Sequence, residues 1–165
     1  MEERINVYVD QDDVLANFAK QHQIDLLANP AIQYPQAVYG FFANLKPLPN
    51  ALESMRELEY MCFDVWILTR PSVYNTLCYT EKRVWIEQHL GLDWCHRLIL
   101  CPDKGSVGTE KDYLVDDFDW KKPKDEELTP WKGTQYQFGQ EGNKDWDEIM
   151  LKFRELAYEK YVEKQ

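Results

Sequence analysis

The chain has 165 residues, which suits one domain with a real hydrophobic core, and its formal net charge is −10. Hydrophobic residues make up 44% of it, which excludes an intrinsically disordered composition. The acidic balance argues against a nucleic-acid polymer as the main partner, because such polymers are usually bound through a basic face. It does not exclude a small anionic substrate, which needs only a local cation or a metal.

No membrane or secretory signal is evident. No apolar run is long enough to span a bilayer, and the first ten residues lack a signal-peptide pattern. The four cysteines show neither CxxC nor Cys/His metal-ligand spacing. We therefore expect a cytoplasmic protein with reduced thiols and no membrane partner.

The chain begins with a strand, a helix and an irregular segment. Residues 4–9 alternate in polarity and are β-branched, which predicts a strand. Residues 14–27 carry apolar side chains at helical spacing and predict a helix. Residues 30–50 are aromatic and contain four prolines, so we expect a loop with one short turn that could form part of a lid.

A helix–strand alternation follows. Residues 50–60 predict a helix with Asn50 as its N-cap, and residues 62–68 predict a second buried strand. Residues 79–90 predict a helix that Gly91 ends. The remaining elements are a short strand at 97–101, another at 113–115, an exposed loop at 121–132, a strand at 134–138 and an amphipathic helix at 145–160.

This order predicts a single α/β domain with a largely parallel sheet and helices on both faces. Ligands of such sheets bind at the carboxyl ends of the strands. Asp10 and Asp12 follow the first strand, Thr69 follows the second, and Asp116 with Asp117 follows the fourth. The sequence therefore predicts a polar site at this edge of the sheet.

The acidic residues in this set predict a metal. Four carboxylates at two neighbouring strand ends repel one another unless some are protonated or a cation lies among them. Carboxylate oxygens suit Mg²⁺, which often bridges to a substrate phosphate. An EF-hand is excluded, because counting from Asp10 places Val14 and Leu15 where that loop needs an acidic residue and glycine. The alternative for Asp13, just before the predicted helix, is an N-cap.

Several motifs resemble those of a known family. The pattern D-x-D-x-V-L at residues 10–15, Thr69 after a strand, Lys82, and Asp116-Asp117 resemble the four motifs of the haloacid dehalogenase superfamily. The segments VDQDDVLANF, GFFANLKPLPNAL, EKRVWIEQHLG and DYLVDDF, in this order, are similar to the 5′(3′)-deoxyribonucleotidase family. The resemblance covers most of residues 5–120. It implies a Rossmann-like three-layer sandwich within residues 1–165, with a small helical cap subdomain at about residues 18–50 inserted after the first strand.

The resemblance also implies a phosphatase mechanism. Asp10 is then the nucleophile that forms an aspartyl-phosphate, and Asp12 is the general acid and later the general base. Mg²⁺ is held by Asp10, Asp12 through its backbone carbonyl, and Asp116 or Asp117. The phosphate is bound by Thr69, Arg70, Lys82 and Lys104.

Each of these roles has a simpler alternative. Thr69 can be a strand-end threonine, and Lys82 can be a solvated lysine in the first turn of a helix. Phe18, Phe41 and Phe42 match family positions around the nucleobase, and their alternative is a small core under the cap.

Three residues depart from the family pattern. Asp13 stands where the family usually has glycine, Arg70 where familiar members have serine, and Pro102 where they have an arginine. Arg70 could add a phosphate contact or narrow the pocket. The changes at Asp13 and Arg70 are compatible with phosphatase chemistry and put the preference for deoxyribonucleotides in doubt.

We expect a Mg²⁺-dependent 5′-nucleotidase of nucleoside monophosphates. Two alternatives stay open: a phosphatase for another small phosphoester, such as a sugar phosphate, and a non-catalytic nucleotide-binding protein of the same fold. Members of the family are often dimers, although no residue pattern here identifies an interface.

Overall fold

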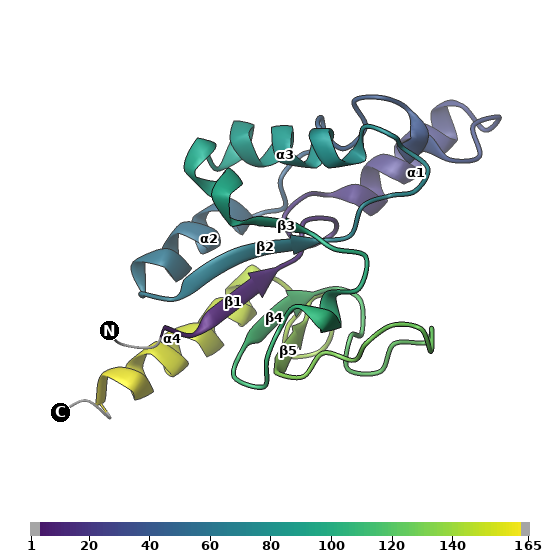
Figure 1. The fold of residues 1–165 in the computed structure, drawn as a ribbon. Helices are drawn as coiled ribbons and strands as arrows, with labels where there is room; N and C mark the ends of the chain where they lie inside the picture. Colours follow the sequence, from purple (N-terminus) through teal and green to yellow (C-terminus); the bar gives the residue numbers. More distant parts are fainter. Residues whose placement is uncertain (1–3, 163–165) are drawn as a thin grey trace.

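The computed structural model describes residues 4–162, which form a five-stranded parallel sheet flanked by helices and loops (Figure 1). The strand order is β3-β2-β1-β4-β5, and each neighbouring pair is parallel. This confirms the predicted α/β fold class. The elements in chain order are β1 (Asn6–Val9), α1 (Phe18–Ala28), η1 (Pro35–Ala37), α2 (Ala51–Tyr60), β2 (Asp64–Thr69), α3 (Cys78–His89), η2 (Leu92–Arg97), β3 (Leu98–Leu100), η3 (Lys104–Ser106), β4 (Tyr113–Asp116), β5 (Thr134–Gln137) and α4 (Trp146–Val162).

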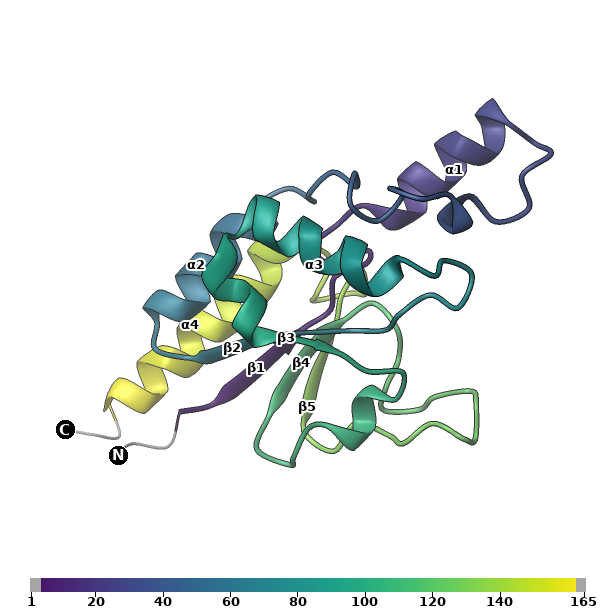
Figure 2. The ribbon, with the colours of Figure 1, turned by 45° about the horizontal axis from the view of Figure 1, so that its top comes forward.

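One face of the sheet packs against three helices. Because side chains alternate along a strand, Val7 and Val9 of β1 and Val65 and Ile67 of β2 point to the same face. They share one apolar cluster with buried side chains of α2, α3 and α4. Figure 2 shows these three helices together on one side of the sheet. This cluster is the main hydrophobic core. Its apolar side chains on α2, α3 and α4 produce the helical spacing that predicted helices at 50–60, 79–90 and 145–160.

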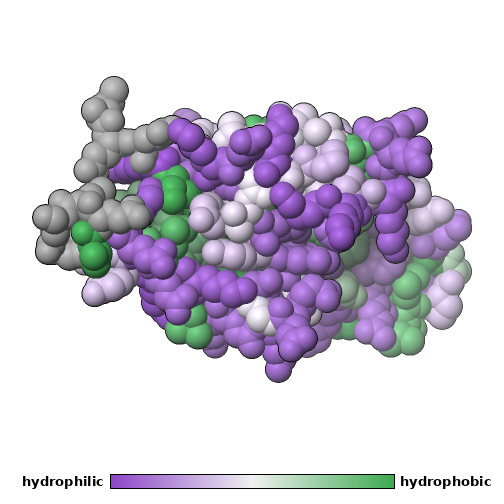
Figure 3. Space-filling model, turned by 90° about the horizontal axis from the view of Figure 1, so that it is seen from below, coloured by the Kyte–Doolittle hydropathy of each residue, from purple (hydrophilic) through white to green (hydrophobic). Residues whose placement is uncertain are grey.

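The other face is covered by loops, which corrects two expectations. Tyr8, Leu68 and Leu114 on this face pack against Trp120 and Trp131. The third layer therefore consists of η3 and long loops rather than long helices. The loop predicted to be exposed at 121–132 buries Trp131, which is 1% exposed, because its ring packs edge-on against Tyr8. The surface seen from below in Figure 1 is mostly hydrophilic (Figure 3).

The first helix begins four residues later than predicted. Residues 14–16 are buried and non-helical, and the backbone of this stretch bonds to residues 46–48: Asn17 N donates to Lys46 O, and Leu48 N donates to Leu15 O. The chain therefore leaves the sheet through this stretch before α1 starts at Phe18. The helical spacing of residues 14–16 instead reflects their complete burial.

Residues 18–50, which we call the cap segment, project from one end of the sheet (Figure 2). They contain α1, whose residues are all at least partly exposed, and the short turn η1 that was expected between the prolines. The segment ends at Asn50, which is the N-cap residue of α2 as predicted, although its side chain makes no capping hydrogen bond. Asn50 has a left-handed backbone with φ of 60° and its side chain donates to Asp147 Oδ1 of α4 at 3.0 Å.

In the described part of the chain, no helix combines the length and apolar character needed to cross a bilayer. All four cysteines are free thiols.

Candidate active site

The ends of three adjacent strands bring the predicted site residues together. Val9, the last residue of β1, pairs with Ile67 of β2 and with Val115 of β4, so the three strands end within two residues of one another. Asp10 continues from β1 and its N–H donates to Val115 O at 2.9 Å. Thr69 ends β2 and Asp116 ends β4. These polar residues therefore lie together at the carboxyl edge of the sheet, where the sequence predicted a polar site.

Lys82 links Asp12 to Thr69. Its Nζ lies 2.7 Å from Asp12 Oδ2 and donates to Thr69 Oγ1, also at 2.7 Å. The Lys82 side chain is 0% exposed, so the alternative of a solvated lysine is wrong. Burial raises the pKa of Asp12 above its ordinary value, although the ammonium of Lys82 opposes that shift. Asp12 Oδ1 is buried and has no hydrogen-bond partner.

Lys104 forms a second link, between Asp10 and Asp116. Its Nζ lies 2.7 Å from Asp10 Oδ1 and 2.6 Å from Asp116 Oδ2. Burial by itself would lower the pKa of Lys104, but the carboxylates of Asp10 and Asp116 hold it above its ordinary value. Lys104 therefore stays charged between two carboxylates, at the centre of the site.

The carboxylates still outnumber the cations. Burial, followed by repulsion from Asp10, raises the pKa of Asp116 to about 7. Desolvation by the surrounding atoms, followed by repulsion from Asp10, raises the pKa of Asp117 to about 7, although part of this residue reaches solvent. These shifts mark an excess of negative charge that Lys104 only partly offsets.

This excess suits a divalent cation. Carboxylate oxygens of Asp10, Asp116 and Asp117 lie within 4.8 Å of one another. Asp10 and Asp116 are buried whereas Asp117 is exposed, so a bound ion could keep some of its water, as Mg²⁺ commonly does. The Asp12 carboxylate is not in this group because it faces Lys82, which leaves only its backbone carbonyl for the predicted metal role.

Asp13 has a structural explanation. Its backbone is left-handed, with φ of 56°, in the region that favours glycine and that aspartate tolerates better than most residues. Its Oδ1 accepts a hydrogen bond from Ala19 N in the first turn of α1 at 2.7 Å. Asp13 thus has a left-handed backbone of the kind that glycine adopts most easily, and it also stabilises the start of the following helix.

The three phenylalanines expected around a nucleobase contact one another. The ring centroids of Phe41 lie 5.3 Å from those of both Phe18 and Phe42. Phe42 also lies under Lys82, with Nζ 5.2 Å from its ring centre. These contacts form the small core that was the alternative interpretation, and they place its Phe42 side next to the ammonium group of Lys82.

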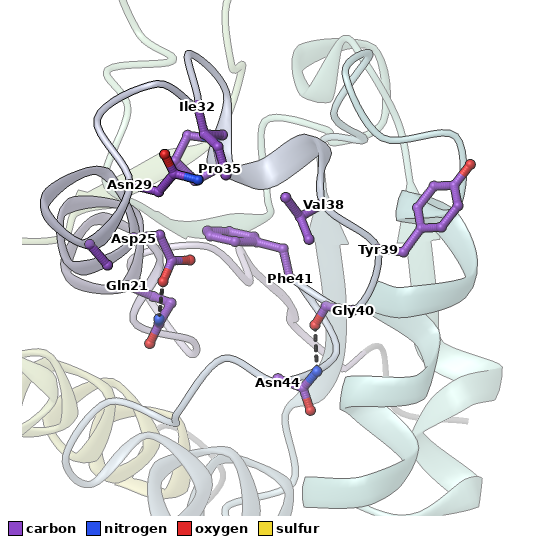
Figure 4. Close-up of a pocket in the computed structure, with 11 residues that line it drawn as sticks. Gln21, Asp25, Asn29, Ile32, Pro35, Val38, Tyr39, Gly40, Phe41 and Asn44 are labelled. Carbon is purple, nitrogen blue, oxygen red and sulfur yellow. Dashed lines mark hydrogen bonds between the residues drawn. The ribbon is translucent and has the colours of Figure 1, made fainter.

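A cavity of about 470 Å³ opens beside this cluster, between α1 and residues 35–44 (Figure 4). Phe41 lines it together with polar side chains, among them Gln21, Asp25 and Asn44. The carboxylates and lysines of the strand ends are not part of its lining. The phenylalanine cluster therefore has the cavity on its Phe41 side and the charged site on its Phe42 side.

Arg70 contacts an aromatic residue that the sequence did not single out. Its guanidinium lies 5.7 Å from the ring centre of Trp120, and Lys104 Nζ lies 5.9 Å from the same ring. Arg70 is exposed, whereas Trp120 is buried. Trp120 follows Asp116 by four residues, but no pattern in the sequence distinguishes it from a core tryptophan.

Comparisons with known proteins point to one family. The model of the family described as 5′ nucleotidase, deoxy (pyrimidine), cytosolic type C protein matches residues 28–150. This range includes Thr69, Lys82 and Lys104 but begins after Asp10 and Asp12.

Individual relatives agree with the family match. A Bordetella pertussis protein named as an inferred 5′(3′)-deoxyribonucleotidase is 42% identical over 85 residues, or 50% of this chain. The human cytosolic-type 5′(3′)-deoxyribonucleotidase is 40% identical over 94 residues, or 56% of this chain. The chain spans less than half of both relatives, 45% in each case.

Among solved structures, that of an inferred haloacid dehalogenase-like hydrolase from Burkholderia xenovorans covers 70% of this chain and 73% of its own, with 14% identity and a TM-score of 0.43. The family model matches well over half of the chain, in the segment that carries α3 and β4. The chain therefore belongs to the 5′ nucleotidase, deoxy (pyrimidine), cytosolic type C protein family.

Proposed function

We propose that this protein is a Mg²⁺-dependent phosphomonoesterase that hydrolyses nucleoside 5′-monophosphates through an aspartyl-phosphate on Asp10. One observation carries the proposal. Two lysines that are almost completely buried, Lys82 and Lys104, each bridge an aspartate to another site residue at the carboxyl edge of the sheet. Burying an ammonium group costs free energy unless carboxylates or another anion pair with it.

In the first step, Asp10 attacks the phosphorus atom. Gln11 N and Lys104 Nζ both contact Oδ1 of Asp10 at 2.7 Å, so we assign the attack to Oδ2. The bond from phosphorus to the ester oxygen breaks as the bond to Asp10 forms. Asp12, whose pKa is raised by burial, gives its proton to the departing oxygen, and the nucleoside leaves.

In the second step, water attacks the phosphorus atom of the aspartyl-phosphate. Asp12 takes a proton from this water, the bond between phosphorus and Asp10 breaks, and inorganic phosphate leaves. Both enzyme carboxylates return to their starting states, so one water is consumed in each turnover. The unpartnered Oδ1 of Asp12 is the atom we assign to both proton transfers.

Neutral and cationic donors would bind the phosphoryl oxygens. Thr69 Oγ1 accepts from Lys82, so its own hydroxyl proton can be donated to the substrate. Lys82 and Lys104 offset charge on the substrate as well as on the aspartates. Bound at Asp10, Asp116 and Asp117, Mg²⁺ would supply electrostatic compensation for the approach of a phosphate to a carboxylate.

Family membership and the phenylalanine cluster support a nucleotide as substrate. The names of the relatives specify deoxyribonucleotides, and aromatic rings can stack on any base. The human relative is of the cytosolic type, which supports a cytoplasmic location. A homodimer is a further prediction, which light scattering after size-exclusion chromatography would check.

A panel of phosphomonoesters with Mg²⁺ tests the function. We expect phosphate release from deoxyribonucleoside 5′-monophosphates to exceed release from hexose phosphates, and Asp10→Asn to abolish it while the circular dichroism spectrum is unchanged. A preference for sugar phosphates would overturn the nucleotide assignment. Activity like that of the unmodified protein in Asp10→Asn would overturn the covalent mechanism.

A further inference from the structure

Glu81 is a buried carboxylate that the proposed chemistry does not use. It lies in the first turn of α3, directly before Lys82, and is 6% exposed. Its Oε1 accepts a hydrogen bond from Gly40 N at 2.7 Å, and its Oε2 accepts one from Phe42 N at 3.0 Å. The side chain of Asn75 donates to both oxygens, at 3.3 and 3.2 Å.

These contacts join two distant segments of the chain. Gly40 and Phe42 belong to the cap segment, whereas Glu81 belongs to the core helix that carries Lys82. Gly40 has a left-handed backbone, with φ of 88°, which glycine adopts more easily than other residues. In this conformation the backbone N–H groups of Gly40 and Phe42 both donate to the Glu81 carboxylate. All three donors to Glu81 are uncharged groups, so the carboxylate is held by directed hydrogen bonds of the strong, charge-assisted kind.

The anchored backbone brackets Phe41 and carries Phe42. Phe42 lies 5.2 Å from Lys82 Nζ, and Phe41 lies between the two bonded amides in sequence and lines the cavity. Adjacent residues of α3 therefore determine both where Lys82 lies and where the phenylalanine loop lies. One turn of α3 therefore connects the phenylalanine cluster to the proposed phosphate site.

We propose that Glu81 is a positioning residue for binding of the nucleobase. It fixes residues 40–42 to α3, so that the phenylalanine cluster stands at a constant position relative to the bound phosphate. Because the phenylalanine cluster is already fixed, the base can bind without ordering a loop, and the affinity is not reduced by the free-energy cost of that ordering. The inference rests on the proposed nucleotidase function, and it concerns only the part of the substrate beyond the phosphate.

Glu81→Gln tests this with little change of shape. The new amide presents N–H₂ to one of the two backbone N–H groups, so at least one hydrogen bond is lost. Glu87→Gln is the matched control, because Glu87 lies on the same helix, is exposed and pairs with Arg83. Both variants remove one negative charge from α3.

The readout is a ratio of two kcat/KM values. Deoxyuridine 5′-monophosphate reports on base and phosphate, whereas 2-deoxyribose 5-phosphate has the same sugar phosphate and no base. We expect Glu81→Gln to lower this ratio about tenfold, as for the loss of a hydrogen bond to a charged group, chiefly through KM of the nucleotide. Glu87→Gln should leave the ratio within about twofold, as is usual for surface substitutions.

The outcomes separate the two proposals. Equal losses on both substrates, or no loss, would overturn the positioning role. If the unmodified protein hydrolyses neither compound, the nucleotidase function fails; affinities of both variants for the nucleotide and for inorganic phosphate then decide the role of Glu81. If Glu81→Gln does not fold, amide hydrogen exchange in the unmodified protein decides, because the amides of Gly40 and Phe42 should be protected and free exchange at both would refute the anchor.

Discussion

Replacing Lys82 by methionine should destabilise the protein in a pH-dependent way. The substitution keeps most of the side-chain volume and removes the ammonium that lies 2.7 Å from Asp12 Oδ2. With an effective dielectric constant of about 20, the Coulomb attraction at this distance is about 6 kcal/mol. Desolvation offsets part of it, and loss of one partner from a buried pair typically costs about 3–5 kcal/mol. The Asp12 side chain is 24% exposed, so we expect about 3 kcal/mol, the lower end of that range.

The sign of the pH dependence follows from Asp12. Burial already raises its pKa, and loss of the Lys82 ammonium removes the main opposing influence. The folded variant then retains a proton that the unfolded chain has released, so its stability falls as pH rises from the unfolded pKa toward the raised folded pKa. Urea unfolding should therefore show a smaller penalty at about pH 5 than at about pH 8.

Asp12→Asn in the Lys82→Met background is the matched control. It removes the carboxylate left without a cation, so it should recover a large part of the lost stability at the higher pH. A penalty that is the same at both pH values, or that the second substitution does not relieve, would refute the reasoning that Lys82 balances a buried charge.

Asp13→Ala should lower the free energy of unfolding by about 2 kcal/mol, about 1 for a left-handed alanine and about 1 for the lost hydrogen bond from Ala19 N. Asp13→Asn should be nearly neutral, and equal urea midpoints for the two variants would contradict this reasoning. Mg²⁺ should raise the thermal midpoint more at about pH 8 than at about pH 6, because Asp116 and Asp117, with pKa values of about 7, must be deprotonated to hold it. Equal shifts in calorimetry at the two pH values would speak against these ligands. Trp131→Ala should cost about 3 kcal/mol or more in urea unfolding, since its ring fills the second face of the sheet; a loss below about 1 kcal/mol would show that the loop layer contributes little.

The regular elements could be predicted because their signals are local. Alternating β-branched runs specify strands, and parallel strands place their carboxyl ends at one edge, so Asp10, Thr69 and Asp116 could be assigned to one site without coordinates. The four residues before α1 have helical spacing but are not helical. Their burial produces helical spacing, but their hydrogen bonds go to residues 46–48, a pairing that no local pattern reveals.

The sequence also did not predict which segments cover the second face of the sheet. Trp131 lies in a charged, proline-containing stretch, and only its contact with Tyr8 shows that this stretch covers the sheet. Gly108 belongs to the same layer, where a Cβ would collide with the Trp131 ring. Such contacts depend on how loops from separate parts of the chain fold onto one another.

The α/β architecture, the acidic strand ends and the family resemblance could be read from the sequence, because each depends on residue type and spacing along the chain. Which cation pairs with which carboxylate depends on the folded chain: Lys82 pairs with Asp12, and Lys104 pairs with Asp10 and Asp116. The tertiary structure also showed that Asp13 combines a left-handed turn with the start of α1, and that Glu81 holds the phenylalanine loop. Partners separated by up to about a hundred residues are selected by packing and desolvation, which act on the folded chain and leave no periodic signal in its sequence.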